Sequence, residues 1–264
     1  MTDDLIVSWD AEKLTDTTRE QISVKLAEET PVGFVFNSVP YAVMMATCQD
    51  MEDYAYGFSI TERLVSNPES IKAIRVEETD DGVSLSLAIS GEDFRRLLQS
   101  RRAMTGRTGC GICGSDDLKS LHTHLAKVPQ KPPVSIAAIR KALAALPAAQ
   151  TLNAQVRMVH GAAWCSSSGD VTLLREDVGR HNALDKLIGA GIRQKADFSE
   201  GFCLITSRCS YEMAQKAIVA GFTTLVAISA PTTRALRLAQ DAGLTIVGLA
   251  RTPSQYLFTG TVQS

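Results

Sequence analysis

Three short apolar stretches decide the fold class: 202–206 (FCLIT), 224–229 (TLVAIS) and 244–250 (LTIVGLA). Between them lie two segments with the length and pattern of helices, 210–220 and 232–242. Strands that alternate with helices of this length form a parallel sheet covered by helices. The sequence therefore predicts an α/β domain, to which we assign residues 134–264.

The residues just before this alternation extend the same domain. An alanine-rich helix is predicted from 135 to about 146, with further helix before 155. A β-hairpin over 158–165 and 171–175 follows, and then a helix over 179–191. The serine-rich and glycine-containing segment between the two strands favours a turn there.

A smaller α+β unit is predicted for residues 1–102. Two hairpins are expected, one across Asn37 and Ser38 and one around Asp80-Asp81-Gly82. The strands of the hairpins are 31–36 with 39–45 and 71–78 with 83–89. The helix after the first hairpin, which Thr47 is expected to cap, repeats apolar residues at helical spacing, and a second helix is expected over 92–102.

Composition excludes several classes of protein. The 264 residues are 45% hydrophobic and 21% charged, and the net charge of −2 gives no basic field for nucleic acid. No apolar run reaches the roughly 18 residues that span a membrane, and the acidic start lacks the order of a signal peptide. Six cysteines, scattered except for one pair, make no disulfide framework. We expect a cytoplasmic protein with no nucleic acid and no membrane partner.

The cysteine pair lies in the long connection 103–133. Cys110 and Cys113 are separated by two residues and flanked by glycines at 106, 109, 111 and 114. Between Phe94 and Gly109 the chain has five arginines and no acidic residue, and positive potential lowers the pKa of a thiol. Arginines near the end of a helix also have an ordinary stabilising role there, so this argument is strongest for Arg107.

Three uses of the pair compete. Zinc would need two more ligands, for which His122 and His124 are candidates, but the gap after Cys113 is shorter than in a zinc finger. A redox pair of the thioredoxin kind belongs at a strand-to-helix turn, which this loop does not resemble. A sulfur relay through a persulfide needs a reactive thiol and a nearby acceptor site. On spacing alone, relay and zinc are equally supported.

Hydroxyls and arginines follow the predicted parallel strands. Ser207 and Arg208 come after the first strand, Ser229 and Thr232 after the second, and Arg251 after the third. The carboxyl ends of parallel strands meet at one edge, where helix N-termini and arginines suit a phosphate. Serine and threonine at these positions also fit an ordinary role as helix caps. We favour a site for a phosphate-bearing ligand.

The stretch 175–186 (REDVGRHNALDK) is dense in polar residues at a strand-to-helix junction. Arg180 and His181 are candidate site residues at its helical start. A structural network is the alternative, because a buried Arg180 would need a partner such as Glu176 or Asp177.

These segments together resemble one family, the formate dehydrogenase accessory sulfurtransferases. The resemblance runs from about residue 29 to the C-terminus, and REDVGRHNALDK is its most specific part. The other matching segments are 45–47 with 56–58, 110–114 (CGICG), 160–163, 210–212 with 215–216, 229–232 and 242–251.

The resemblance implies a function and a fold. Such proteins take sulfur from a cysteine desulfurase as a persulfide and pass it to the metal of the molybdenum or tungsten bis(guanine dinucleotide) pterin cofactor of formate dehydrogenase. Their α/β domain is similar to the cytidine deaminase fold, a three-layer arrangement with helices on both faces of a sheet. Members tend to be homodimers.

The resemblance also implies roles for residues. Cys110 would carry the persulfide, with Cys113 a second carrier or a resolving thiol, and no metal is expected. The cofactor would be bound as substrate by the strand-end residues and by the stretch that follows the last predicted strand. The residues expected to bind it are Arg180, His181, Ser207, Arg208, Ser229, Thr232, Leu249, Ala250, Arg251, Thr252, Pro253 and Ser254.

Two other functions, a nucleobase deaminase and a cofactor chaperone, are alternatives to sulfur transfer. A zinc-dependent nucleobase deaminase needs a glutamate two residues after its first ligand and a Cys-x-x-Cys on the next helix, and neither is present at His181 or Cys209. A chaperone for the cofactor that moves no sulfur, with a structural or zinc-binding cysteine pair, remains the alternative. Cys165, Cys203 and Cys209 fall in or beside buried strands and are expected to serve packing.

Overall fold

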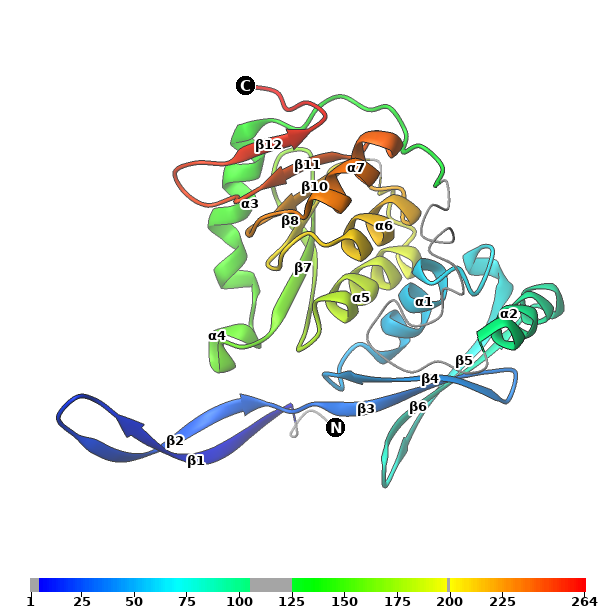
Figure 1. Ribbon diagram of the computed structural model, residues 1–264, viewed down its shortest axis with the longest axis horizontal. Helices are drawn as coiled ribbons and strands as arrows, with labels where there is room; N and C mark the ends of the chain where they lie inside the picture. The colour runs from blue at the N-terminus through cyan, green and yellow to red at the C-terminus, as the bar shows by residue number, and fades with distance from the viewer. Residues whose placement is uncertain (1–4, 105–124, 199) are drawn as a thin grey trace.

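A six-stranded sheet forms the centre of the computed structural model, which describes residues 5–104, 125–198 and 200–264 (Figure 1). Its order is β12-β11-β10-β9-β7-β8. The strands are β7 (His160–Cys165), β8 (Val171–Asp177), β9 (Phe202–Ile205), β10 (Thr224–Ala227), β11 (Thr245–Gly248) and β12 (Tyr256–Thr259). β9, β10 and β11 are parallel, as predicted, and β7 and β8 form the predicted hairpin.

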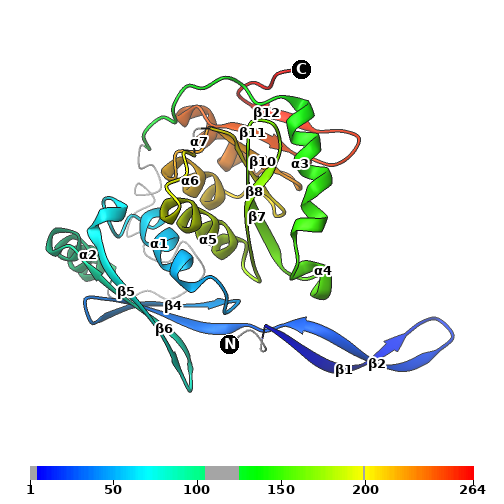
Figure 2. The same cartoon turned by 180° about the vertical axis from the view of Figure 1, so that it is seen from behind.

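Helices cover both faces of this sheet, so the predicted three-layer α/β class is confirmed (Figures 1 and 2). One face carries α5 (Arg180–Arg193), α6 (Tyr211–Val219) and α7 (Thr233–Ala242), and the other carries α3 (Ile136–Ala149). The short α4 (Asn153–Val156) leads from α3 to β7. Alternation along each strand explains the layers, since Ala162 packs toward α5 and Ala163 toward α3.

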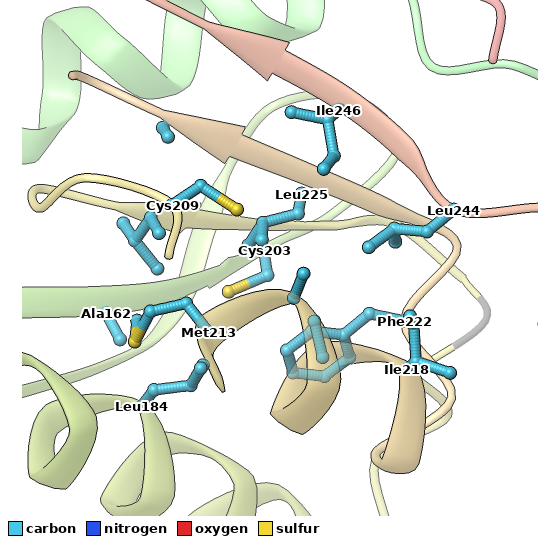
Figure 3. Close-up of a cluster of buried hydrophobic side chains, with 14 of the residues drawn as sticks. Ala162, Leu184, Cys203, Cys209, Met213, Ile218, Phe222, Leu225, Leu244 and Ile246 are labelled. Carbon is cyan, nitrogen blue, oxygen red and sulfur yellow. The ribbon is translucent and has the colours of Figure 1, made fainter. Parts of the chain in front are cut away.

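The core between the sheet and α6 holds buried sulfur-containing side chains (Figure 3). Cys203 and Cys209 are fully buried beside Met213, and Cys165 is fully buried on the other face of the sheet. Burial raises the pKa of Cys165 and of Cys209 to about 12 and that of Cys203 well above its ordinary value. A thiol with so high a pKa carries little thiolate, so the predicted packing role of these cysteines is confirmed.

The N-terminal part contains a four-stranded sheet of order β4-β3-β6-β5. Its strands are β3 (Thr30–Phe36), β4 (Val39–Ala46), β5 (Ile71–Thr79) and β6 (Gly82–Ile89), and its helices are α1 (Met51–Thr61), α2 (Gly91–Met104) and the short 3-10 helix η1 (Pro68–Ser70). Both predicted hairpins are present. Asn37 and Ser38 both have positive φ, 46° and 67°, which is the backbone of a tight two-residue hairpin turn.

Thr47 does not cap α1, contrary to the prediction. The helix begins after Asp50, whose side chain makes no capping hydrogen bond. Thr47 instead reaches the α/β domain: its hydroxyl accepts a hydrogen bond from the Val178 amide at 3.1 Å, and its amide donates to Asp177 Oδ2 at 3.0 Å. The partners are about 130 residues away in sequence, which local spacing cannot reveal.

A hairpin arm, β1 (Ile6–Leu14) and β2 (Arg19–Ala27), was not predicted. It extends away from the body of the molecule (Figures 1 and 2). Its base is anchored by Ala27, which packs in a small cluster with Leu152, Val156 and Val159. Trp9 on the arm is 64% exposed.

The predicted connection 103–133 overlaps ordered elements at both of its ends. α2 continues to Met104, and Val128 is buried in the core between the sheet and α5–α7. The Val128 amide donates to the carbonyl oxygen of Ala242 at 2.9 Å, so the connection rejoins the α/β domain beside the end of α7. Within the part of the chain that the structure describes, no helix is long and apolar enough to cross a membrane.

Candidate functional site

The carboxyl ends of β9, β10 and β11 gather the loops that were predicted to form a site. The Thr232 amide donates to the Cys209 carbonyl oxygen at 3.0 Å, which ties the loop after β10 to the loop after β9. The Leu249 amide donates to the Ser229 carbonyl oxygen at 3.1 Å, which ties the chain after β11 to the same edge. The structure therefore brings the predicted strand-end residues together.

The hydroxyls at this edge mostly serve the fold. Ser207 is buried and donates to the Arg208 carbonyl oxygen at 3.1 Å. Thr232 Oγ1 accepts from the Ala235 amide at 3.3 Å and Ser210 Oγ accepts from the Met213 amide, so both cap helices. The capping alternative thus describes Ser210 and Thr232, while Arg208 and Arg251 are exposed at this edge.

The stretch 249–254 forms an exposed turn beyond β11. Leu249 has a φ of 48° and is 38% exposed, whereas Ala250 is buried. The Arg251 amide donates to the Ser254 carbonyl oxygen at 3.1 Å, which closes the turn. Arg251, Thr252, Pro253 and Ser254 are exposed, and Pro253 and Ser254 line a cavity of about 290 Å³ together with residues of α3.

Most polar side chains of 175–186 join the N-terminal unit to the α/β domain. Arg175 donates to Asp53 Oδ2 on α1 through Nε at 2.9 Å and Nη2 at 2.7 Å. Asn182 accepts from the Tyr54 hydroxyl at 2.7 Å and donates to the Met45 carbonyl oxygen at 2.8 Å. The structural alternative is therefore correct for these residues.

The two acidic residues before α5 are not the partners of Arg180. Glu176 accepts from the backbone amides of Leu152 and Asn153 at 2.8 and 2.9 Å. Asp177 Oδ2 lies 2.6 Å from Lys186 Nζ, and both side chains are fully buried. Arg180 therefore does not pair with Glu176 or Asp177, because backbone amides and the buried Lys186 are already the partners of these carboxylates.

Arg180 and His181 remain at the edge, together with His160 and Glu212, which lie in matching segments of the sequence but were not predicted as site residues. His181 Nε2 lies 3.0 Å from Glu212 Oε2 across the starts of α5 and α6. Arg180 Nε is buried and has no hydrogen-bond partner among the described residues. Burial lowers the pKa of His160, and the nearby charges of Arg180 and His181 lower it further against the opposing effect of Asp177.

The positions of His160 and Glu212 in the sequence indicate only weakly that they lie at this edge. His160 opens β7, which runs antiparallel to β9, so its first residue lies at the carboxyl edge of β9. Glu212 lies in the first turn of α6, where a carboxylate is expected for the helix dipole alone. Its pKa is lowered by the hydrogen bond with His181, against the effect of burial.

The described residues of this edge include groups that suit an anion. Among the described residues no group of three histidine, cysteine, aspartate or glutamate side chains could hold a metal ion. The guanidinium groups of Arg180, Arg208 and Arg251 lie at the start of α5 and after β9 and β11, and Arg180 Nε has a free donor. Phosphate groups fit such donors.

The predicted persulfide carriers Cys110 and Cys113 lie outside the described residues, as do Arg107, His122 and His124. The candidate site described here is the carboxyl edge alone.

Comparisons with known proteins agree with the resemblance. The sequence pattern of the FdhD/NarQ family matches residues 27–263. The chain is 48% identical over 226 residues to the sulfur carrier protein FdhD of Xanthomonas euvesicatoria pv. vesicatoria (strain 85-10), covering 86% of this chain and 80% of that one. It is 41% identical over 237 residues to the sulfur carrier protein FdhD of Bordetella petrii, covering 90% and 85%.

A crystal structure of a putative formate dehydrogenase accessory protein from Desulfotalea psychrophila has the same fold, with a TM-score of 0.75 and 97% of each chain covered. At 21% identity this likeness concerns the fold alone. The match of the family pattern over nearly the whole chain, with relatives above 40% identity, is decisive. The chain belongs to the FdhD/NarQ family.

Proposed function

We propose that this protein is a sulfurtransferase that carries sulfur as a persulfide to the cofactor of formate dehydrogenase. The observation that carries the proposal is its membership of a family whose curated relatives are named sulfur carrier proteins, combined with the Cys-x-x-Cys pair at 110–113. The sulfur donor is a cysteine desulfurase. The acceptor is the metal of a bis(guanine dinucleotide) pterin cofactor, which the protein binds as substrate.

The first step is sulfur exchange at Cys110. Its thiolate attacks the terminal sulfur of the donor persulfide, so a new sulfur–sulfur bond forms at Cys110. The bond between the two donor sulfurs breaks, and the donor cysteine leaves as a thiolate with the electron pair of that bond. The positive charge of Arg107 favours the thiolate form of Cys110. Cys113 serves as a second carrier or as a resolving thiol.

The carboxyl edge of the sheet binds the substrate cofactor. Arg208 and Arg251 are exposed after β9 and β11, and Arg180 Nε offers a buried donor that has no partner among the described residues. Each matches the phosphates of a guanine dinucleotide, and α6 and α7 begin at the same edge. We extend the proposal to a cytoplasmic homodimer, in line with the resemblance, which implies that members tend to be homodimers.

One observation favours a second candidate function, a cofactor chaperone that moves no sulfur. The arginines that suit a phosphate ligand are built on the α/β domain and do not need the cysteines. Full activation of formate dehydrogenase by a Cys110→Ala/Cys113→Ala double variant would establish that function.

Intact-mass analysis after incubation with a cysteine desulfurase and cysteine tests the sulfur relay. We expect a mass increase of one sulfur atom that reductant removes, that Cys110→Ala abolishes, and that the matched control Cys48→Ala retains. Cys48 is the control because it is the partly exposed thiol among the described cysteines. No mass increase in the wild type, with stoichiometric zinc in the same sample, would refute the relay in favour of a structural metal site.

A further inference from the structure

One residue of α3 makes hydrogen bonds to the turn 251–255. Arg140 Nε donates to Gln255 Oε1 at 3.1 Å, and Arg140 Nη2 donates to the Pro253 carbonyl oxygen at 3.3 Å. A planar guanidinium can reach two acceptors at once with fixed spacing, whereas a lysine ammonium acts from one point. Arg140 therefore holds the turn at two of its residues.

The Gln255 side chain links Arg140 to Arg251 by hydrogen bonds. Its Nε2 donates to the Arg251 carbonyl oxygen at 2.9 Å, while its Oε1 accepts from Arg140. The Arg251 amide in turn donates to Ser254 at 3.1 Å. Hydrogen bonds thus run without interruption from α3 through Gln255 to the backbone of the arginine that ends the predicted cofactor-binding edge.

Packing beneath the turn is incomplete. Pro253 and Ser254 of the turn line a cavity of about 290 Å³ together with apolar side chains of α3, β11 and β12, among them Ile136, Ile139, Val247 and Leu257. Empty volume at this place means fewer van der Waals contacts than close packing would give, so polar contacts matter more for the position of the turn. The two hydrogen bonds of Arg140 are the polar contacts that span this gap among the described residues.

We propose that Arg140 is a positioning residue that orients Arg251 for the nucleotide end of the cofactor. The proposal rests on the proposed function, since it concerns the same edge. It assigns to α3, on the face of the sheet opposite α5–α7, a part in binding that the strand-end residues alone would not explain. Both acceptors that Arg140 uses, Gln255 Oε1 and the Pro253 carbonyl oxygen, belong to the turn itself.

The experiment compares Arg140→Ala, Arg140→Lys and Gln255→Ala with the wild type in two measurements. Hydrogen exchange reports the protection of amides 249–255, and calorimetry with guanosine diphosphate reports binding. Lys141→Ala is the matched control, because Lys141 lies on the same helix but pairs with Asp170 at 2.7 Å at the other end of the sheet.

Arg140→Ala is expected to increase exchange at 249–255 and to weaken guanosine diphosphate binding about three- to tenfold, the range for losing one or two hydrogen bonds. Arg140→Lys should show most of the same loss of protection and of affinity, since one ammonium cannot serve both acceptors. Gln255→Ala should also increase exchange and weaken binding, because it removes both the acceptor of Arg140 and the donor to the Arg251 carbonyl oxygen. Lys141→Ala should change neither measurement.

Two results overturn the proposal: unchanged exchange at 249–255 in Arg140→Ala, or increased exchange with wild-type affinity for guanosine diphosphate. Failure of the proposed cofactor binding gives a different result. In that case the wild type binds no guanosine diphosphate, while exchange at 249–255 still shows whether Arg140 holds the turn.

Discussion

Lys216 Nζ on α6 lies 3.0 Å from Asp185 Oδ2 on α5, and both side chains are buried where α1 of the N-terminal unit packs against them. The same ammonium contacts Glu62 Oε1 at 2.7 Å and donates to Thr61 Oγ1 at 2.9 Å. Charges from both units therefore neutralise each other inside the molecule. Such a network stabilises only while it is complete.

Lys216→Met should destabilise the protein by about 3–5 kcal/mol at neutral pH, because it leaves Asp185 buried without its partner. Burial raises the pKa of Asp185, and the loss of Lys216 would raise it further. A carboxyl with a raised folded-state pKa contributes stability below its unfolded pKa and loses it as pH rises through the folded value. The deficit should therefore shrink on acidification toward the ordinary aspartate pKa of 3.8.

Urea unfolding of Lys216→Met, Asp185→Asn and the double variant measures this effect. The double variant should lose less free energy of unfolding than the sum of the two single variants. Strict additivity would mean that the pair does not act as a unit.

Gly57→Ala should destabilise the contact between α1 and α5. A methyl group on Gly57 would overlap the carbonyl oxygen of Asp185, and one on Gly189 would overlap that of Asp53. Backbones that approach this closely cannot give way easily, so a loss of about 1–3 kcal/mol is expected by thermal or urea unfolding. Gly91→Ala is the control, because a methyl group there meets nothing within 4 Å. Equal stability of the two variants would contradict the close approach.

His160 should make the stability of the protein depend on pH between its lowered pKa and the ordinary value of 6.5. Burial and then the charges of Arg180 and His181 lower the pKa of His160, so the folded state binds this proton less readily than the unfolded chain. Stability should therefore rise with pH across that window. His160→Gln should flatten the rise in the free energy of unfolding, and parallel curves for both proteins would show that His160 does not contribute.

Cys165, Cys203 and Cys209 should resist alkylation in the folded protein. They are buried, and burial raises the pKa of each thiol. Mass spectrometry after brief treatment with N-ethylmaleimide at pH 7 should find no label on these three residues, while all six cysteines of the chain should react in denaturant. Rapid labelling of Cys203 in the folded state would contradict the packing role.

The α/β alternation was predictable because each parallel strand is a short, mostly apolar run next to an amphipathic helix, and every residue of these strands is buried. β12 was not, since Tyr256, Leu257 and Phe258 are 55%, 47% and 37% exposed and show no alternation of buried and exposed positions. The arm was missed for a similar reason. Trp9 and Leu14 on β1 are more than 60% exposed, so no buried face marks that strand.

The candidate site was predictable only in part. Strand ends locate Arg208, Ser229 and Arg251 at one edge, because the rule depends on topology and not on contacts. For the stretch 175–186 the sequence left a binding site and a structural network open, because the partners of its residues lie far away in sequence. Tyr54 and Asn182, for example, are 128 positions apart, and their hydrogen bond requires both units to be folded.

The union of α1 with α5 and α6 also constrains how this protein can evolve. Tyr54, Thr61 and Glu62 on or just after α1 meet Asn182, Asp185 and Lys216 on α5 and α6 through hydrogen bonds or ion pairs that leave little room for change on one side only. A substitution at one of them is tolerated when its partner changes too. Among relatives of this chain, substitutions at these paired positions should therefore be correlated. Chimeras that combine the N-terminal unit of one relative with the α/β domain of another should fold only where the paired residues match.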